Sequence, residues 1–183
     1  MLKILHILCV VSCLLFSTFI FSHQNETIVH GPFNISWCGN GQFYFEETHD
    51  LEYPIHFILE CGDEKKIIDR YYVDGANFII LSNRQKPDMG IESVFFQEIG
   101  SKKHLFVIIK RNITHRALGI NGDDYRVYAY ENSPKNIIQL DKNIMKDNNL
   151  SGFEGESDGE ESHFKYKTAA EVKKYIKETY NKK

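Results

Sequence analysis

The sequence lacks the short motifs that carry common enzyme chemistry. It has no Gly-x-Ser-x-Gly nucleophile elbow, no His-Glu-x-x-His zinc helix and no glycine-rich phosphate loop. It also lacks a basic excess, because 22 Lys and Arg stand against 25 Asp and Glu, a formal net charge of −3. A nucleic-acid binder needs a basic face to neutralise phosphates, so nucleic acid is not an expected partner. From motifs we assign no catalytic residue, no cofactor and no metal ligand.

Cysteine is scarce, with four residues at Cys9, Cys13, Cys38 and Cys61. The first two lie in the apolar N-terminal run, and neither Cys38 nor Cys61 has a His or second Cys at zinc-ligand spacing. In an oxidising compartment we therefore expect a disulfide between Cys38 and Cys61. It would close a loop of about 24 residues, which the chain-entropy model values at roughly 3.5 kcal/mol.

Residues 1–22 have the features of a secretory signal peptide. A short positive start with Lys3 precedes the apolar run Ile4 to Phe21, and Ser22 offers a small residue before a polar stretch. The pattern predicts cleavage after Ser22 and a periplasmic or extracellular protein without stable membrane insertion.

Two other fates of this N-terminal segment stay open. The apolar run is just long enough to remain as an uncleaved membrane anchor. The sequence Val-Val-Ser-Cys that ends at Cys13 has the form of a bacterial lipoprotein signal, although the mostly apolar residues that follow are not a typical tether.

The remaining chain, residues 23–183, predicts a single α+β domain. Short runs rich in Ile, Val, Phe and Tyr indicate an antiparallel sheet of about seven short strands with a C-terminal helix packed on it. We expect a turn at Gly122 to Asp124 and a further short strand at His163–Tyr166. The other expected strands are Gln42–Glu47, Ile55–Cys61, Lys66–Val73, Asn77–Leu81, Ser93–Ile99, His104–Arg111, Tyr125–Tyr130 and Ile137–Leu140.

The clearest single element is a helix at residues 168–181. Thr168 and Glu171 have the spacing of a capping box, in which each side chain satisfies a backbone N–H of the first turn. Val172 and Ile176 fall on one stripe with Tyr175 and Tyr180, and this apolar stripe is expected to face the sheet.

Residues 141–162 lose the strand pattern and predict a long acidic loop. Five carboxylates fall within eight residues, at Glu154, Glu156, Asp158, Glu160 and Glu161. Such a segment is either a solvated linker kept open by self-repulsion or a surface that steers toward a cationic protein and enters its cleft. In the second case these five residues and Phe153 form the partner-binding site. An irregular calcium site is a third possibility, although no EF-hand register fits.

The sequence therefore favours an exported, non-catalytic binding protein of the inhibitor or immunity type, with a cationic secreted hydrolase or toxin as its partner. Two alternatives remain. One is a secreted hydrolase with a cryptic site, which would join His49 to Glu46 or Asp50, and the other is a structural protein of the envelope or cell surface. His56 and His104 lie in or beside apolar strands, where a lone His is usually a core or sheet-face residue.

Overall fold

The computed structural model describes residues 27–72, 88–133 and 138–181. The N-terminal segment 1–22 and the expected strand Asn77–Leu81 lie outside the described residues. The described strands are β1 (Thr27–Ile35), β2 (Gly41–Glu47), β3 (Ile55–Cys61), β4 (Glu64–Tyr71), β5 (Met89–Ile99), β6 (Lys102–His115), β7 (Ile120–Asn132), β8 (Ile138–Leu140), β9 (Ser151–Ser157) and β10 (Glu160–Ser162). The helices are the 3-10 turns η1 (Arg116–Leu118), η2 (Ile144–Lys146) and η3 (Asn148–Leu150), and the α-helix α3 (Ala169–Tyr180).

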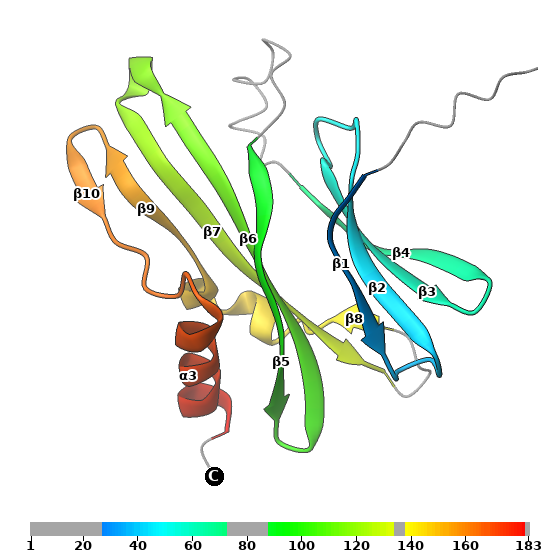
Figure 1. Ribbon diagram of the computed structural model, residues 1–183. Coiled ribbons are helices and arrows are strands. Elements are labelled where there is room, and N and C mark those ends of the chain that lie inside the picture. The colour runs from blue at the N-terminus through cyan, green and yellow to red at the C-terminus, as the bar shows by residue number, and fades with distance from the viewer. Residues whose placement is uncertain (1–26, 73–87, 134–137, 182–183) are drawn as a thin grey trace, which may run out of the picture.

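The strands form two antiparallel sheets, and the protein is α+β as expected. One sheet has four strands in the order β1-β2-β3-β4, and the second has the order β10-β9-β7-β6-β5, with β8 also paired to β7. The described residues thus hold ten strands, which is more than the seven or so expected. Figure 1 shows the four-stranded sheet and α3 on opposite sides of the second sheet.

The central pair β6 and β7 is covered on both faces. Residues Leu105 to Ile109 of β6 are all buried, and successive side chains of a strand point to opposite faces. Leu105, Val107 and Ile109 pack against the aromatic side of the four-stranded sheet, with Phe43, Phe45 and Phe57. Phe106 and Ile108 instead pack beneath α3, with Val172 and Ile176. The continuous apolar run of β6 is therefore the shared wall of two cores.

Three hydrogen-bonding side chains cross between the sheets within the first core. The hydroxyl of Tyr130 on β7 lies 2.7 Å from Oδ2 of Asp69 and 3.0 Å from the hydroxyl of Tyr71, both on β4. Tyr130 has one proton, so it donates to the Asp69 carboxylate and accepts from Tyr71. Burial raises the pKa of both phenols well above the ordinary tyrosine value, so both remain neutral donors.

The expected disulfide between Cys38 and Cys61 is present. Cys61 ends β3 and pairs with Gly41 at the start of β2, so the bond joins the ends of that hairpin. Glycine is required at position 41, because a Cβ there would collide with the Cys38 sulfur.

The C-terminal helix and its cap are confirmed. The helix spans Ala169–Tyr180, Thr168 is its N-cap, and both halves of the capping box with Glu171 are formed. Val172 and Ile176 are both 0 % exposed, so the predicted apolar stripe does face the second sheet.

Asp147, which lies between η2 and η3, connects this helix to the segment that follows β8 through two tyrosines of the helix. Its Oδ2 accepts hydrogen bonds from the hydroxyls of Tyr175 at 2.6 Å and Tyr180 at 2.9 Å. Burial alone would raise the pKa of Asp147, but these bonds and two from Asn149 outweigh burial, and the net pKa is lowered.

The expectation of a long loop at residues 141–162 is wrong. Residues 144–146 and 148–150 form η2 and η3, and the five acidic residues lie on β9, β10 and the turn between these strands. β9 is held by backbone pairing to β7, which needs no alternation of apolar side chains. Hydrophobic periodicity does not predict β9, because this strand consists mostly of Gly, Ser and Glu.

Three smaller expectations also differ. Gly122 to Asp124 is not a turn but part of β7, and the chain reverses at η1 and Gly119 instead. His163–Tyr166 forms no strand; Phe164 from this segment is 8 % exposed and stacks on Tyr125. β1 was not expected, because its register shifts twice around Gly31 and Pro32, so its apolar residues do not alternate regularly along the strand. No helix among the described residues is long and apolar enough to cross a membrane.

Truncation of the α3 stripe tests the second core. Ile176→Ala should lower the free energy of unfolding by about 2 to 5 kcal/mol, because the deleted atoms leave a cavity beneath the helix. Lys174→Ala on the exposed side of the same helix is the control and should change it by less than about 0.5 kcal/mol. Equal effects in urea unfolding would show that the helix is not docked.

The pKa of Asp147 predicts how stability depends on acid. Because that pKa is lowered by folding, ionised Asp147 stabilises the fold above the ordinary Asp value, and the contribution is lost as the pH falls through the folded-state value. Asp147→Asn should therefore be less stable than wild type at neutral pH, with the difference shrinking below about pH 4. A difference in unfolding free energy that stays constant from pH 7 to pH 2 would contradict this role.

Candidate functional site

The acidic residues lie on a tight hairpin at the edge of the second sheet. β9 ends at Ser157, β10 begins at Glu160, and Asp158 and Gly159 form the turn with φ values of 54° and 82°. Two successive left-handed residues are typical of a type I′ turn, for which Asp-Gly is a preferred sequence. The Asp158-Gly159 pair was thus the signal that could have predicted a hairpin.

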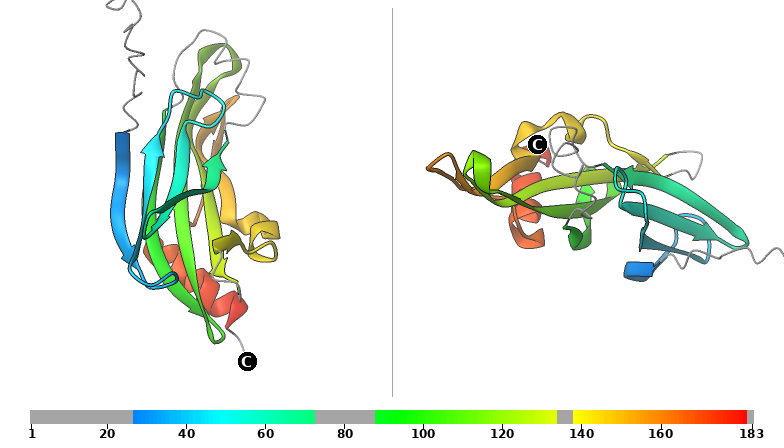
Figure 2. Two further views of the ribbon diagram at one scale, coloured as in Figure 1. Left: turned by 90° about the vertical axis from the view of Figure 1, so that its right-hand side faces the viewer. Right: turned by 90° about the horizontal axis from the view of Figure 1, so that it is seen from above.

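The hairpin projects away from both cores. Figure 1 shows β9, β10 and the adjoining ends of β6 and β7 extending beyond α3. Viewed from above in Figure 2, the hairpin and the four-stranded sheet lie at opposite ends of the molecule. Solvent therefore reaches much of the hairpin surface.

The five carboxylates are divided between two faces and the turn. Glu154 and Glu156 are two residues apart on β9, so their side chains lie on the same face of the sheet. Glu161 of β10 pairs directly with Glu156 and therefore lies on that face too. Glu160 pairs with Ser157 and belongs to the opposite face, whereas Asp158 occupies the turn.

Glu154 is already occupied within the protein. Its Oε2 accepts the backbone N–H of Phe164 at 2.8 Å and lies 3.0 Å from Nζ of Lys167, and Oε1 lies 3.5 Å from Nδ1 of His163. The hydrogen bond from Lys167 is the main cause that lowers the pKa of Glu154. This carboxylate holds the chain segment that leads to α3, through contacts within the protein.

The other four carboxylates remain available at the surface. Glu156, Asp158 and Glu160 are exposed, and within ranges 27–72, 88–133 and 138–181 none of them forms an ion pair or side-chain hydrogen bond. Glu161 has one weak contact, 3.7 Å from the exposed ring of His163. Like charges directly across a β pair are destabilising by some tenths of a kcal/mol, so the Glu156 and Glu161 pair opposes the local fold.

Phe153, which was expected to bind a partner, also packs against Gly122 within the protein. Gly122 on β7 pairs with Gly155 on β9, and the ring of Phe153 reaches over Gly122 so closely that a Cβ there would collide with it. The ring thus covers a glycine pair that has no side chains of its own. Phe153 is half-buried and offers a partner only part of its surface.

The side chains of the expected hydrolase site are not brought together. Glu46 is buried and forms an ion pair with Lys65 at 2.7 Å, while Asp50 accepts backbone N–H bonds from Glu52 and Tyr53. In the described part of the chain, no hydrogen bond or ion pair joins His49 to either carboxylate.

A pocket of about 660 Å³ lies beside the disulfide, lined in part by Trp37, Phe96 and Lys103. Among the described residues of its lining, Glu60 is the only carboxylate and no histidine occurs; the Glu60 oxygens accept hydrogen bonds from Gln42 and Tyr44. The hydrogen bond from Tyr44 is the main cause that lowers the pKa of Glu60.

Comparisons of this chain with protein-family models, curated proteins and solved structures found no match.

Neutralising Glu154 or Glu156, which lie two residues apart on β9, should have different effects on the melting temperature. Glu154→Gln should lower the melting temperature, because Lys167 and the Phe164 N–H lose a charged acceptor. Glu156→Gln should leave the melting temperature unchanged or raise it slightly, because it removes a like-charge pair with Glu161. Thermal unfolding of both variants at one pH and ionic strength checks the contrast, which equal losses would contradict.

Proposed function

We propose that this protein is an exported, non-catalytic binding protein that uses the β9 and β10 hairpin to engage a cationic protein, as an inhibitor or immunity protein does. The observation that carries the proposal is the projecting hairpin, on which Glu156, Asp158 and Glu160 form no ion pair with any residue that the structure describes. The Cys38 to Cys61 disulfide supports the exported location, since such bonds persist in oxidising compartments.

The charge arrangement favours recognition over fold stability. Glu156 and Glu161 repel one another across the strand pair, and in the described ranges the one cationic contact that offsets this is the weak one from His163 to Glu161. A Lys or Arg side chain from a partner would lie between two carboxylates and relieve the repulsion. Complementary charge of this kind acts chiefly on the association rate, which falls as salt screens it.

The shape of the hairpin suits insertion into a concave surface. Its turn contains two residues and its edge strand β10 has three, while its other strand, β9, stays paired to β7 as far as Ser157 beside the turn. Backbone pairing of β9 to β7 over seven residues holds it in one orientation, so little order has to be gained on binding. A cationic active-site cleft is the kind of partner surface that matches these features.

The experiment measures association rates of a cationic partner isolated from secreted and envelope fractions. The triple variant Glu156→Gln, Glu160→Gln, Glu161→Gln should associate more slowly than wild type at low salt. The wild-type rate should fall as salt is raised, and the variant rate should change much less. Asp158 is left unchanged because it has the left-handed turn conformation.

A matched variant removes the same charge elsewhere. Asp63→Asn, Glu64→Gln and Glu178→Gln are exposed changes outside the hairpin, and the triple control should associate at nearly the wild-type rate. If both triple variants slow association equally, the effect is one of net charge and the hairpin is not the binding site.

A further inference from the structure

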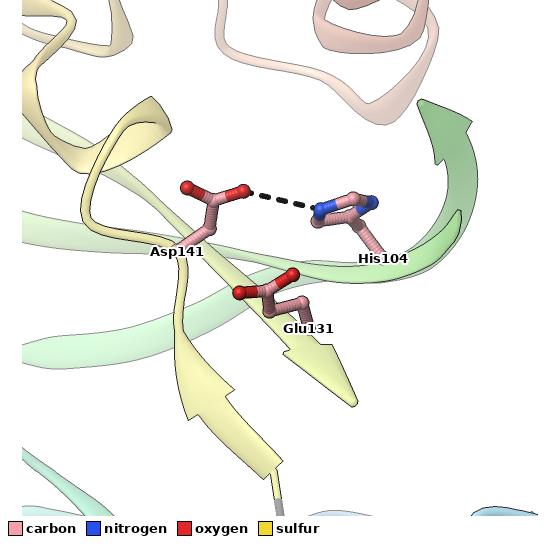
Figure 3. A group of neighbouring side chains, drawn as sticks. All are labelled: His104, Glu131 and Asp141. Carbon is pink, nitrogen blue, oxygen red and sulfur yellow. Dashed lines mark hydrogen bonds and ion pairs between the residues drawn. The ribbon is translucent and has the colours of Figure 1, made fainter. Parts of the chain in front are cut away.

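We propose a binding site for a divalent first-row transition metal ion, such as Zn²⁺, formed by His104, Glu131 and Asp141. Each residue offers one ligand atom, and these atoms all lie within 4.8 Å of one another. Figure 3 shows the ring of His104 and the two carboxylates converging from three separate segments. This site lies in the second sheet, at a place independent of the acidic hairpin.

Backbone pairing places the three residues together. His104 near the start of β6 is the direct partner of Glu131 near the end of β7. Asp141 directly follows β8, and its backbone N–H donates to the carbonyl of Ala129 at 2.9 Å. The site is thus built on paired strands, which hold ligands more firmly than a free loop does.

Both ring nitrogens of His104 face an oxygen atom. The residue is 2 % exposed, its Nδ1 lies 3.2 Å from the Lys102 carbonyl, and its Nε2 lies 3.2 Å from Oδ2 of Asp141. A neutral imidazole has one N–H, which satisfies only one of these two acceptors. When Nδ1–H donates to the Lys102 carbonyl, the lone pair of Nε2 faces the Asp141 carboxylate, and a bound metal ion would be coordinated by both atoms.

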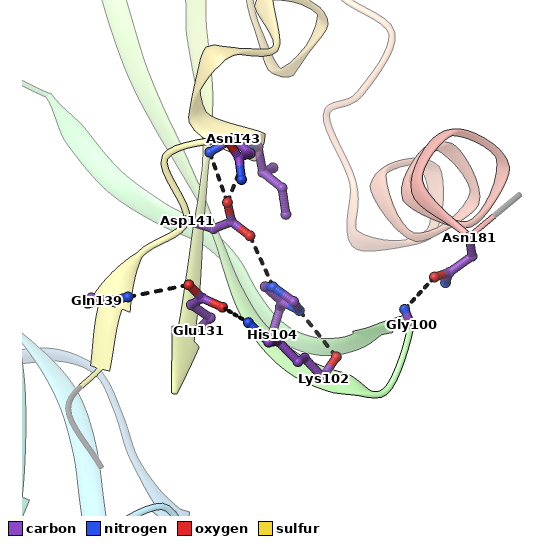
Figure 4. Close-up of polar contacts among 9 residues, drawn as sticks. Gly100, Lys102, His104, Glu131, Gln139, Asp141, Asn143 and Asn181 are labelled. Carbon is purple, nitrogen blue, oxygen red and sulfur yellow. Dashed lines mark hydrogen bonds and ion pairs between the residues drawn. The ribbon is translucent and has the colours of Figure 1, made fainter. Parts of the chain in front are cut away.

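The surroundings match the outer shell of a metal site. Metal-binding histidines typically donate their other N–H to a carbonyl or carboxylate, and Lys102 O is placed to accept from Nδ1. Oδ1 of Asp141 accepts the backbone N–H of Asn143 at 2.9 Å, which leaves Oδ2 directed at His104. Gln139 donates to Oε1 of Glu131 at 3.3 Å (Figure 4).

Lys102 is the cation that competes for this position. Its Nζ lies 2.8 Å from Oε2 of Glu131, but its side chain is 64 % exposed and can turn away into solvent. A nitrogen ligand with two carboxylates suits zinc and its first-row neighbours better than calcium or magnesium, which prefer oxygen ligands alone. Three protein ligands leave at least one position for water.

Zinc titration of the untagged protein by calorimetry tests the site. Wild type should bind one Zn²⁺, and Glu131→Gln and Asp141→Asn should each weaken binding by at least about tenfold. Lys102→Ala should strengthen binding, because it removes the competing ammonium from Glu131. A purely structural role for the Lys102 pair predicts no change in zinc affinity.

The exposed His163, which lies beside Glu154 and Glu161, provides the matched control. His163→Gln should leave zinc affinity unchanged, because this histidine lies outside the proposed site. Far-UV circular dichroism confirms that each variant is folded before titration. Loss of zinc binding in His163→Gln, an affinity unaffected by Asp141→Asn, or no binding by either wild type or Lys102→Ala would overturn the proposal.

Discussion

The structure depends on the burial of both faces of the β6 and β7 pair. An antiparallel sheet commonly has one solvent-exposed face, but here all residues from Leu105 to Ile109 of β6 are buried. One face requires the aromatic side of the four-stranded sheet, and the other requires α3. Removing either layer would expose apolar surface on the same two strands, so the two cores stabilise the fold together.

The two ends of this pair have different chemical consequences. At one end β6 and β7 continue beyond both covering layers, and β9 pairs with the exposed part and carries the acidic hairpin. At the other end their pairing sets His104 beside Glu131, where Asp141 completes a polar cluster. Both proposed sites are therefore held by backbone hydrogen bonds to the most buried strands.

Sequence patterns predicted the elements that bury an apolar stripe or run. The helix cap at Thr168, the stripe of Val172 and Ile176, and the strand Ile55–Cys61 follow from local chemistry and agree with the structure. β9 could not be found this way, because it is held by pairing to β7 and carries Gly, Ser and Glu. The His104 cluster was missed because its members are far apart in the sequence and only strand register joins them.

The same reasoning explains which acidic residues sequence could and could not assign. Charge density identified the segment from Glu154 to Glu161, but it could not show that Glu154 neutralises Lys167 or that Phe153 covers Gly122.

Amide hydrogen exchange with and without a bound cationic partner tests the account most directly. The account predicts that the amides of Leu105 to Ile109 exchange slowest in both states and that new protection falls on residues 151–162. New protection elsewhere, with the hairpin unchanged, would contradict it.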